Sequence, residues 1–180
     1  QESIATKQRL LATCLPRIEG LCQRAVAALA AGGKLMLCGN GGSSCDAAHA
    51  AGELIGWFEN KDRPGFAAVA LGHEVPSLTA IGNDAGFEQV FERQLRAIGR
   101  GGDLLIGIST SGSSRNVVRA MTAARELGIA TAALMSSRDG PMAELADVAV
   151  RVPSTNTARI QESHLLCLHI LCAAVEQELS

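Results

Sequence analysis

The sequence predicts an α/β fold: a three-layer, doubly wound sandwich with a five-stranded parallel sheet and an N-terminal helical arm. Five short runs of residues are apolar nearly throughout, which is typical of strands covered on both faces. These runs alternate with stretches of helical periodicity, which favours a parallel, flavodoxin-like sheet. The 180 residues are 47% apolar and 19% charged, which is enough for one full core. We therefore expect a single domain over 1–180, with the arm at 1–31 and the α/β core at 34–180.

The expected elements follow in order along the chain. Residues 4–31 carry apolar side chains close to helical spacing, with Pro16 expected to break the helix and Gly32-Gly33 to end it. The five strands are expected at 34–38, 66–71, 103–109, 129–135 and 148–152. The helices of the core are expected at 43–57, 87–98, 114–127 and 141–146, with a long closing helix at 157–179.

Charge and composition argue against several classes of partner. The net charge is −2 and aromatic residues make up only 3% of the chain, which disfavours binding to nucleic acid or to an anionic membrane surface. The longest uncharged apolar stretch is too short to span a bilayer. Six cysteines form no Cys-x-x-Cys pair, as expected of unpaired thiols in a reducing compartment. These features predict a cytoplasmic protein.

Two glycine- and serine-rich segments, 38–44 and 108–114, each lie between an expected strand and the helix that follows it. Such a junction directs backbone N–H groups and the positive end of a helix toward one point, where an anion is stabilised. Neither segment matches the ATP-binding or dinucleotide-binding motif, so a phosphate without a nucleotide fits better. The alternative is a pair of ordinary turns and helix caps. Because both segments lie at the carboxyl edge of one sheet, we favour a phosphate site.

His49 and Glu53 are candidates for the chemistry. They are four residues apart on the helix expected over 43–57, so they share one face about 6 Å apart along its axis. An imidazole and a carboxylate placed in this way can bind one divalent metal ion or act as a proton-transfer pair. The alternative is a solvated surface pair, which is common on helices.

The closing helix carries Gln161, His164 and His169. His169 lies within an apolar run, where a buried core histidine is the alternative to a functional one. Gln161 and His169 are about 12 Å apart along a helix axis. They can reach one point only if the helix is distorted or if the site draws on more than one subunit. His164 is out of phase with His169, and we expect it at the surface or at an interface.

Five motifs together resemble the sugar isomerase (SIS) domain family and, within it, the phosphoheptose isomerases. The matching segments are CGNGGS at 38–43, DAAH at 46–49 with EL at 53–54, LTAIGND at 78–84, GISTSG at 107–112 and ARIQE at 158–162 with the histidine at 169. The resemblance implies an aldose-ketose isomerase that converts sedoheptulose 7-phosphate to D-glycero-D-manno-heptose 7-phosphate through an enediol(ate), the first step of ADP- or GDP-heptose synthesis.

The resemblance also implies roles for individual residues. Contacts to the sugar phosphate would come from Asn40, Gly41, Gly42, Asn83 and Asp84, and the phosphate would be held by Ser109, Thr110, Ser111 and Ser114. One zinc ion (Zn2+) per subunit would be bound by His49, Glu53, Gln161 and His169, the first three of which would also contact the substrate. Glu53 and His169 would be the catalytic acid and base. The family is typically a homotetramer with active sites between subunits.

The chain departs from the family pattern at Trp57, where many members have an arginine, so a cation that could reach the substrate is missing. Two other functions remain as alternatives. One is a non-catalytic SIS protein that binds a replication initiator, and the other is a SIS domain that binds amino-sugar phosphates. Proteins of the first kind lack the residues matching Glu53 and His169, and both are present here.

Overall fold

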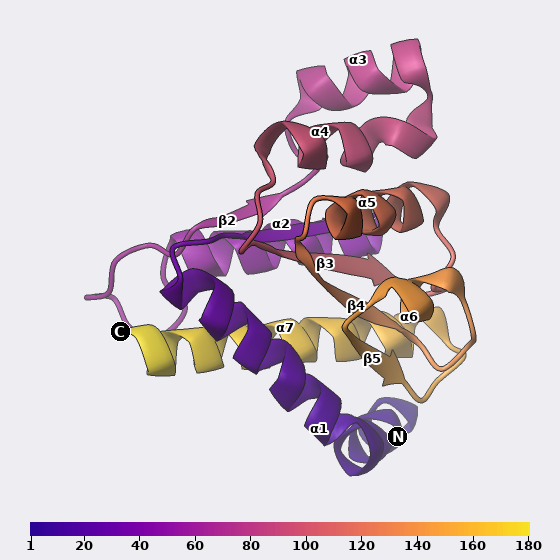
Figure 1. Cartoon of the computed structure of the whole chain (residues 1–180). Helices are drawn as coiled ribbons and strands as arrows, with labels where there is room; N and C mark the ends of the chain where they lie inside the picture. The colour runs from indigo at the N-terminus through magenta and orange to yellow at the C-terminus, as the bar shows by residue number, and fades with distance from the viewer.

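Five parallel strands form one sheet in the order β2-β1-β3-β4-β5 (Figure 1). The computed structural model describes all residues from 1 to 180. The strands are β1 Leu35–Gly39, β2 Ala68–Ala70, β3 Leu104–Ser109, β4 Ala130–Ser136 and β5 Val148–Val152. The expected α/β class and the place of each strand are thus confirmed. β2 is shorter than expected because it lies at the edge of the sheet and pairs with β1 alone.

Helices cover both faces of the sheet and make the three layers. One face packs against α1 Glu2–Ala30, α2 Gly42–Ile55 and α7 Thr157–Leu179, and the other against α4 Val90–Ile98, α5 Arg115–Glu126 and α6 Pro141–Leu145. β1 contributes side chains to the cores on both faces of the sheet. Leu35 and Leu37 pack in the first core, under α1, α2 and α7, and Met36 and Cys38 pack in the second core, under α4, α5 and α6. This follows from the alternation of side chains along a strand. None of the helices combines the length and the apolar character needed to cross a bilayer.

The break expected at Pro16 is not present, because α1 runs through the proline from Glu2 to Ala30. A proline removes one backbone hydrogen bond and crowds the carbonyl four residues before it. Pro16 and Ala12 are both exposed, so water can solvate that carbonyl. The opposite face of the helix packs in the first core and against α7, which holds the helix together across the proline.

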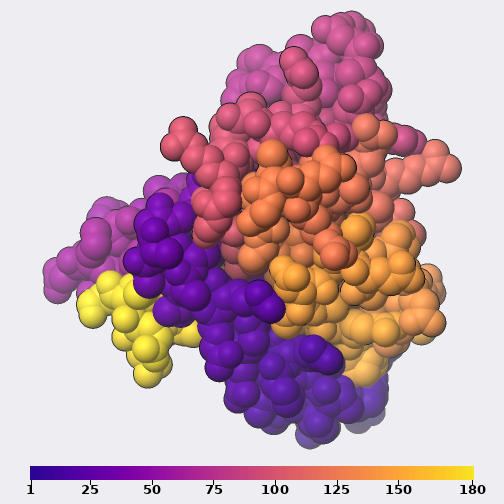
Figure 2. Space-filling model, viewed as in Figure 1, coloured from indigo at the N-terminus to yellow at the C-terminus, as the bar shows by residue number.

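One helix, α3 Val75–Ala85, was not predicted from the sequence. It has Pro76 in its first turn and contains no fully buried residue, and only Leu78 and Ile81 pack, partly buried, against the core beneath α4 and α5. The helix expected at 87–98 begins as a 3₁₀ turn, Phe87–Gln89, and becomes α4 at Val90. In Figure 2 the α3 segment forms a knob at the top of the molecule.

His164 is buried in the core, which corrects the expectation that it lies at the surface or at an interface. Its exposed fraction is 0%, and burial lowers the pKa of its imidazole from 6.5 to about 4. The reason is that α7 has neighbours on several sides, since it contacts α1, α2, β4 and β5. A position out of phase with His169 on this helix therefore still faces packed protein.

Candidate active site at the carboxyl edge of the sheet

The two glycine- and serine-rich segments lie next to each other at the carboxyl edge of the sheet. Gly39 of β1 and Ile108 of β3 are register partners, so these neighbouring strands end level. Loop 1, residues 39–42, leads into α2, and loop 2, residues 109–114, leads into α5. They hold seven of the residues predicted to bind substrate: Asn40, Gly41, Gly42, Ser109, Thr110, Ser111 and Ser114. Ser114, the N-cap residue of α5, makes no side-chain capping hydrogen bond, and the N-cap residue of α2 is Gly41, which has no side chain.

Loop 2 brings its serine hydroxyls together. Ser109 Oγ lies 3.2 Å from Ser111 Oγ and 2.8 Å from Ser114 Oγ. Gly112, at a φ of +69°, makes the tight turn between them, in a backbone conformation that favours glycine. Ser113, which the motifs did not assign, joins the cluster with its Oγ 3.1 Å from Ser111 Oγ. Hydroxyls that both donate and accept can exchange these mutual bonds for bonds to phosphate oxygens.

Loop 1 is joined to the start of α5 by two hydrogen bonds between side-chain amides. Asn40 Nδ2 donates to Asn116 Oδ1 at 2.9 Å, and Asn116 Nδ2 donates to Asn40 Oδ1 at 2.8 Å. Asn116 is 4% exposed. Sequence reasoning did not identify this residue. The sequence does hold one indication of its role: Asn116 is a polar residue at a position of α5 that faces the sheet, where the neighbouring inward positions are apolar.

Three predicted residues from two helices meet at a second point. His49 Nε2 on α2 and His169 Nε2 on α7 are 2.9 Å apart, and their ring centroids are 5.1 Å apart. Glu53 Oε1 lies 3.6 Å from His49 Nε2. The ring of Phe58 is 5.7 Å from that of His169. His49 is exposed and His169 only partly buried, so His169 is not a core histidine. One chain thus brings an imidazole pair and a carboxylate together.

Gln161 lies apart from this histidine pair. Its carboxamide occupies the space that a Cβ at Gly42 would fill. Since Gly42 faces Gln161 and His49 faces His169, α2 and α7 run parallel, and the two contacts are about 10 Å apart along the helices. The helix carrying Gln161 and His169 is continuous from Thr157 to Leu179, so the alternative of a distorted helix is not supported. Within one chain Gln161 contacts loop 1.

Asn83 and Asp84 lie at the end of α3 and are exposed. Asn83 Nδ2 donates to Asp84 Oδ1 at 2.7 Å. The segment after α3 is held beside loop 2, because Glu88 pairs with Arg115 at the start of α5 at 2.9 Å. The predicted contact of Asn83 and Asp84 with the substrate would therefore come from the rim of the site.

A buried ion pair connects the two helices that carry Glu53 and His169. Arg63 Nε and Glu176 Oε2 are 2.5 Å apart, with side chains 1% and 9% exposed. Arg63 also donates to the backbone carbonyls of Glu53 and Leu54, which satisfies the end of α2. Burial alone would raise the pKa of Glu176, but hydrogen bonds from Arg63 and from two backbone N–H groups outweigh it and lower that pKa. This pair could not be predicted from local sequence patterns, because its members are 113 positions apart.

Residues 1–136 match the family model described as SIS domain. Over 179 residues the chain is 46% identical to a phosphoheptose isomerase of Roseiflexus sp., an alignment that covers 99% of this chain and 90% of the relative. The chain belongs to the phosphoheptose isomerase family of SIS-domain proteins. Two solved phosphoheptose isomerase structures share its fold. That from Neisseria gonorrhoeae is 42% identical with a TM-score of 0.92, covering 98% of this chain and 94% of that one. That from Francisella tularensis is 36% identical with a TM-score of 0.94, covering 98% and 93%.

Proposed function

We propose that this member of the phosphoheptose isomerase family converts sedoheptulose 7-phosphate to D-glycero-D-manno-heptose 7-phosphate through an enediolate. Family membership supports the reaction. The observation that carries it is the placement of Glu53 and His169 around His49, on helices that start or pass beside the two loops. A carboxylate and an imidazole near an anion-binding edge are the groups that an isomerase of sugar phosphates needs.

The reaction moves a carbonyl from C2 to C1 of the sugar. A proton leaves C1, the negative charge of the enediolate is stabilised, a proton passes from O1 to O2, and a proton is returned to C2. Loops 1 and 2 would hold the terminal phosphate through backbone N–H groups and the serine hydroxyls. His49 lies about 10 Å along α2 from Gly42, a span suited to an extended seven-carbon chain. Glu53 and His169 would then divide the two proton transfers from opposite sides of C1 and C2.

The residues around the histidine pair fit zinc by their chemistry. Two imidazole nitrogens and a carboxylate oxygen are donor types that zinc prefers. Nowhere in the protein are three His, Cys, Asp or Glu side chains already arranged as a metal site. Nitrogen ligands of tetrahedral zinc lie about 3.3 Å apart at ordinary bond lengths, so the hydrogen-bonded pair would have to open by a few tenths of an ångström. Asp46 Oδ2 is buried and has no hydrogen-bond partner, and burial raises the pKa of this carboxyl despite the opposing charge interaction with His49.

We propose that His49, Glu53 and His169 hold this zinc ion, with the Gln161 side chain of another subunit completing the set, because α7 is continuous and places its own Gln161 at Gly42. When bound, zinc would polarise the oxygens on C1 and C2 and so stabilise the enediolate. Glu53 and His169 cannot serve fully in both tasks, because a carboxylate or an imidazole nitrogen that is bound to zinc is a weaker base. Which of the two releases the metal therefore decides which of them takes the first proton.

The zinc-loaded protein is expected to interconvert the two heptose 7-phosphates, which NMR of the sugar signals follows directly. Removing the metal with a chelator should abolish most of the turnover, and adding zinc back should restore it. His49→Ala should lower the zinc content per chain, measured by elemental analysis without reference to activity. Full turnover in metal-free protein would rule out the zinc proposal. Binding of an amino-sugar phosphate without turnover of the heptulose would instead favour a non-catalytic SIS domain.

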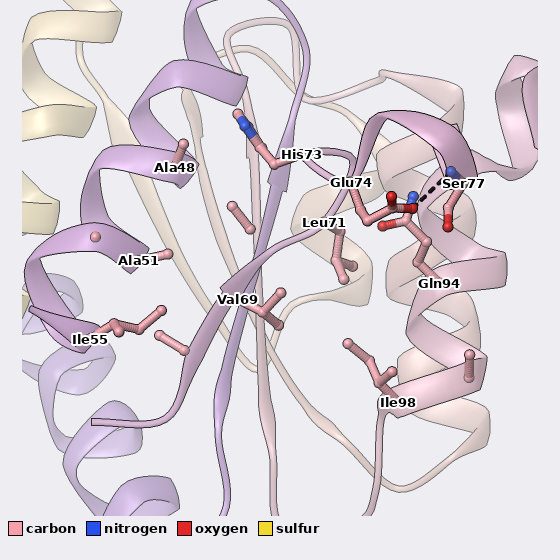
Figure 3. A pocket seen from close by; sticks show the side chains of 14 residues that line it. Ala48, Ala51, Ile55, Val69, Leu71, His73, Glu74, Ser77, Gln94 and Ile98 are labelled. Atoms are coloured by element: carbon pink, nitrogen blue, oxygen red, sulfur yellow. Dashed lines mark hydrogen bonds between the residues drawn. The ribbon is translucent and has the colours of Figure 1, made fainter. Parts of the chain in front are cut away.

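We propose that the protein is a homo-oligomer, a tetramer by its family resemblance, with active sites between subunits. An apolar groove of about 660 Å³ runs along the edge strand β2, between α2 and α4 (Figure 3). Ile55, Val69, Leu71 and Ile98 line it, and it contains none of the predicted site residues. Ile55 is 55% exposed and Ile98 41% exposed. A second copy over this groove would bury that apolar surface and would lie against the helix that carries Glu53.

Ile98→Glu is expected to reduce the oligomer to smaller species, because it places a charge in the apolar groove. Light scattering coupled to size exclusion measures the mass. Leu127→Glu is the matched control, since Leu127 is 37% exposed and lies at the end of α5, outside the groove. The proposal that the groove is an interface is wrong if Ile98→Glu keeps the wild-type mass.

We also propose a cytoplasmic location. All six cysteines are free, and every one except Cys45 is buried. Burial raises the pKa of the Cys38 thiol to about 12, so it remains a neutral, small apolar group. Free thiols in these numbers are typical of proteins that work in a reducing compartment.

A further inference from the structure

We propose that Asn116 is a positioning residue for the substrate and that it acts through Asn40. The two side chains exchange hydrogen bonds of 2.9 and 2.8 Å, so each amide is both donor and acceptor to the other. Asn40 belongs to loop 1 and Asn116 to the first turn of α5, directly after loop 2. The amide pair therefore joins the two loops across neighbouring strands. This inference rests on the proposed function, in which both loops hold one substrate.

The amide pair fixes the orientation of Asn40 as well as its position. If the Asn40 amide were flipped, its N–H group would face the N–H group of Asn116 and its oxygen would face the other oxygen. The partner itself is fixed, because Asn116 is 4% exposed and its Oδ1 also accepts the N–H of Val117 at 3.0 Å. A buried residue thus defines how a half-buried one presents its groups.

The pair leaves Asn40 able to bind a ligand. Each amide nitrogen has two hydrogens and each oxygen two lone pairs, and the pair uses one of each on Asn40. The second N–H and the second lone pair are free to meet the sugar phosphate. Because the loops are already joined before substrate arrives, less freedom has to be lost on binding. Loss of Asn116 should therefore weaken binding more than it slows the chemical step.

The test is a double-mutant cycle with the zinc-loaded enzyme and sedoheptulose 7-phosphate. Asn40→Ala and Asn116→Ala are each expected to raise KM roughly tenfold while kcat changes by less than about threefold, a loss of binding of the size that one or two hydrogen bonds contribute. The double variant should have the KM of Asn40→Ala alone, because residues that act through one another are not additive. Val117→Ala is the matched control: it also loses buried atoms at the start of α5, and its KM should stay near that of the wild type.

Each other outcome decides against the proposal. Multiplied losses in the double variant would mean that Asn116 acts independently of Asn40. An unchanged KM in Asn116→Ala, or the same rise in Val117→Ala, would reduce Asn116 to a structural residue while the isomerase activity stands. An unchanged KM in Asn40→Ala would remove loop 1 from the substrate site and the positioning role with it. Absence of turnover in the wild type would contradict the proposed function itself. In that case the affinity for inorganic phosphate of the wild type, the two single variants and the double variant would still show whether the two amides are coupled.

Discussion

Glu53→Gln and His169→Asn are each expected to lower the turnover of sedoheptulose 7-phosphate by about 10²- to 10⁴-fold, the usual contribution of a positioned acid or base. Glutamine keeps the shape of Glu53 but takes no proton at neutral pH, and asparagine can replace at most one nitrogen of His169. NMR of product formation measures the rates. Zinc should be added in excess, so that weaker metal binding is not mistaken for a lost proton transfer.

Both variants should keep their fold and their oligomeric mass, because Glu53 and His169 are partly exposed and neither belongs to a core cluster. Glu59→Gln is the matched control for Glu53. Glu59 is an exposed carboxylate shortly after the end of the same helix, and its replacement should leave turnover within about twofold of the wild type. If the Glu53→Gln variant and the His169→Asn variant both kept normal turnover, the proposed site would be wrong.

The stability of the protein is expected to fall between pH 6.5 and pH 4 because of His164. Burial lowers the pKa of this histidine from 6.5 to about 4, so the unfolded chain takes up a proton over this range and the folded chain does not. Above pH 6.5 the imidazole is neutral in both the folded and the unfolded chain, so its protonation costs no stability there. The free energy of unfolding then decreases as the pH falls through this window. The full loss is about 3 kcal/mol, from a pKa difference of roughly 2.5.

His164→Leu tests this expectation by replacing the imidazole with an apolar side chain of similar size. The free energy of unfolding, from urea denaturation at pH 7, 5.5 and 4.5, should fall less steeply for the variant than for the wild type. The comparison isolates His164, because the carboxylates whose pKa is lowered, such as Asp103, lose their contribution equally in both proteins. His73→Leu, which removes an exposed histidine, should keep the wild-type slope. Parallel slopes for wild type and His164→Leu would contradict the assignment.

The sequence alone determined the fold class, the positions of the five strands and the two loops. These features are local. A strand buried on both faces must be apolar along its length, and a loop that turns sharply before a helix needs glycine and small polar residues. The helical period also placed His49 and Glu53 on one face, four residues apart. The five motifs then identified the family, and the comparisons with known proteins confirmed it.

Only the tertiary structure decided which distant residues meet. His49 contacts His169 across 120 positions, Asn40 contacts Asn116 across 76, and Arg63 pairs with Glu176 across 113. The tertiary structure also places His164 in the core, which the residues around it in the sequence did not indicate. The physical reason is that periodicity records which face of an element is apolar, but not which element covers it. Which element covers a given face depends on how α2 packs against α7 and on how both loops lie along one edge of the sheet. All the strands and helices of the domain together determine that packing.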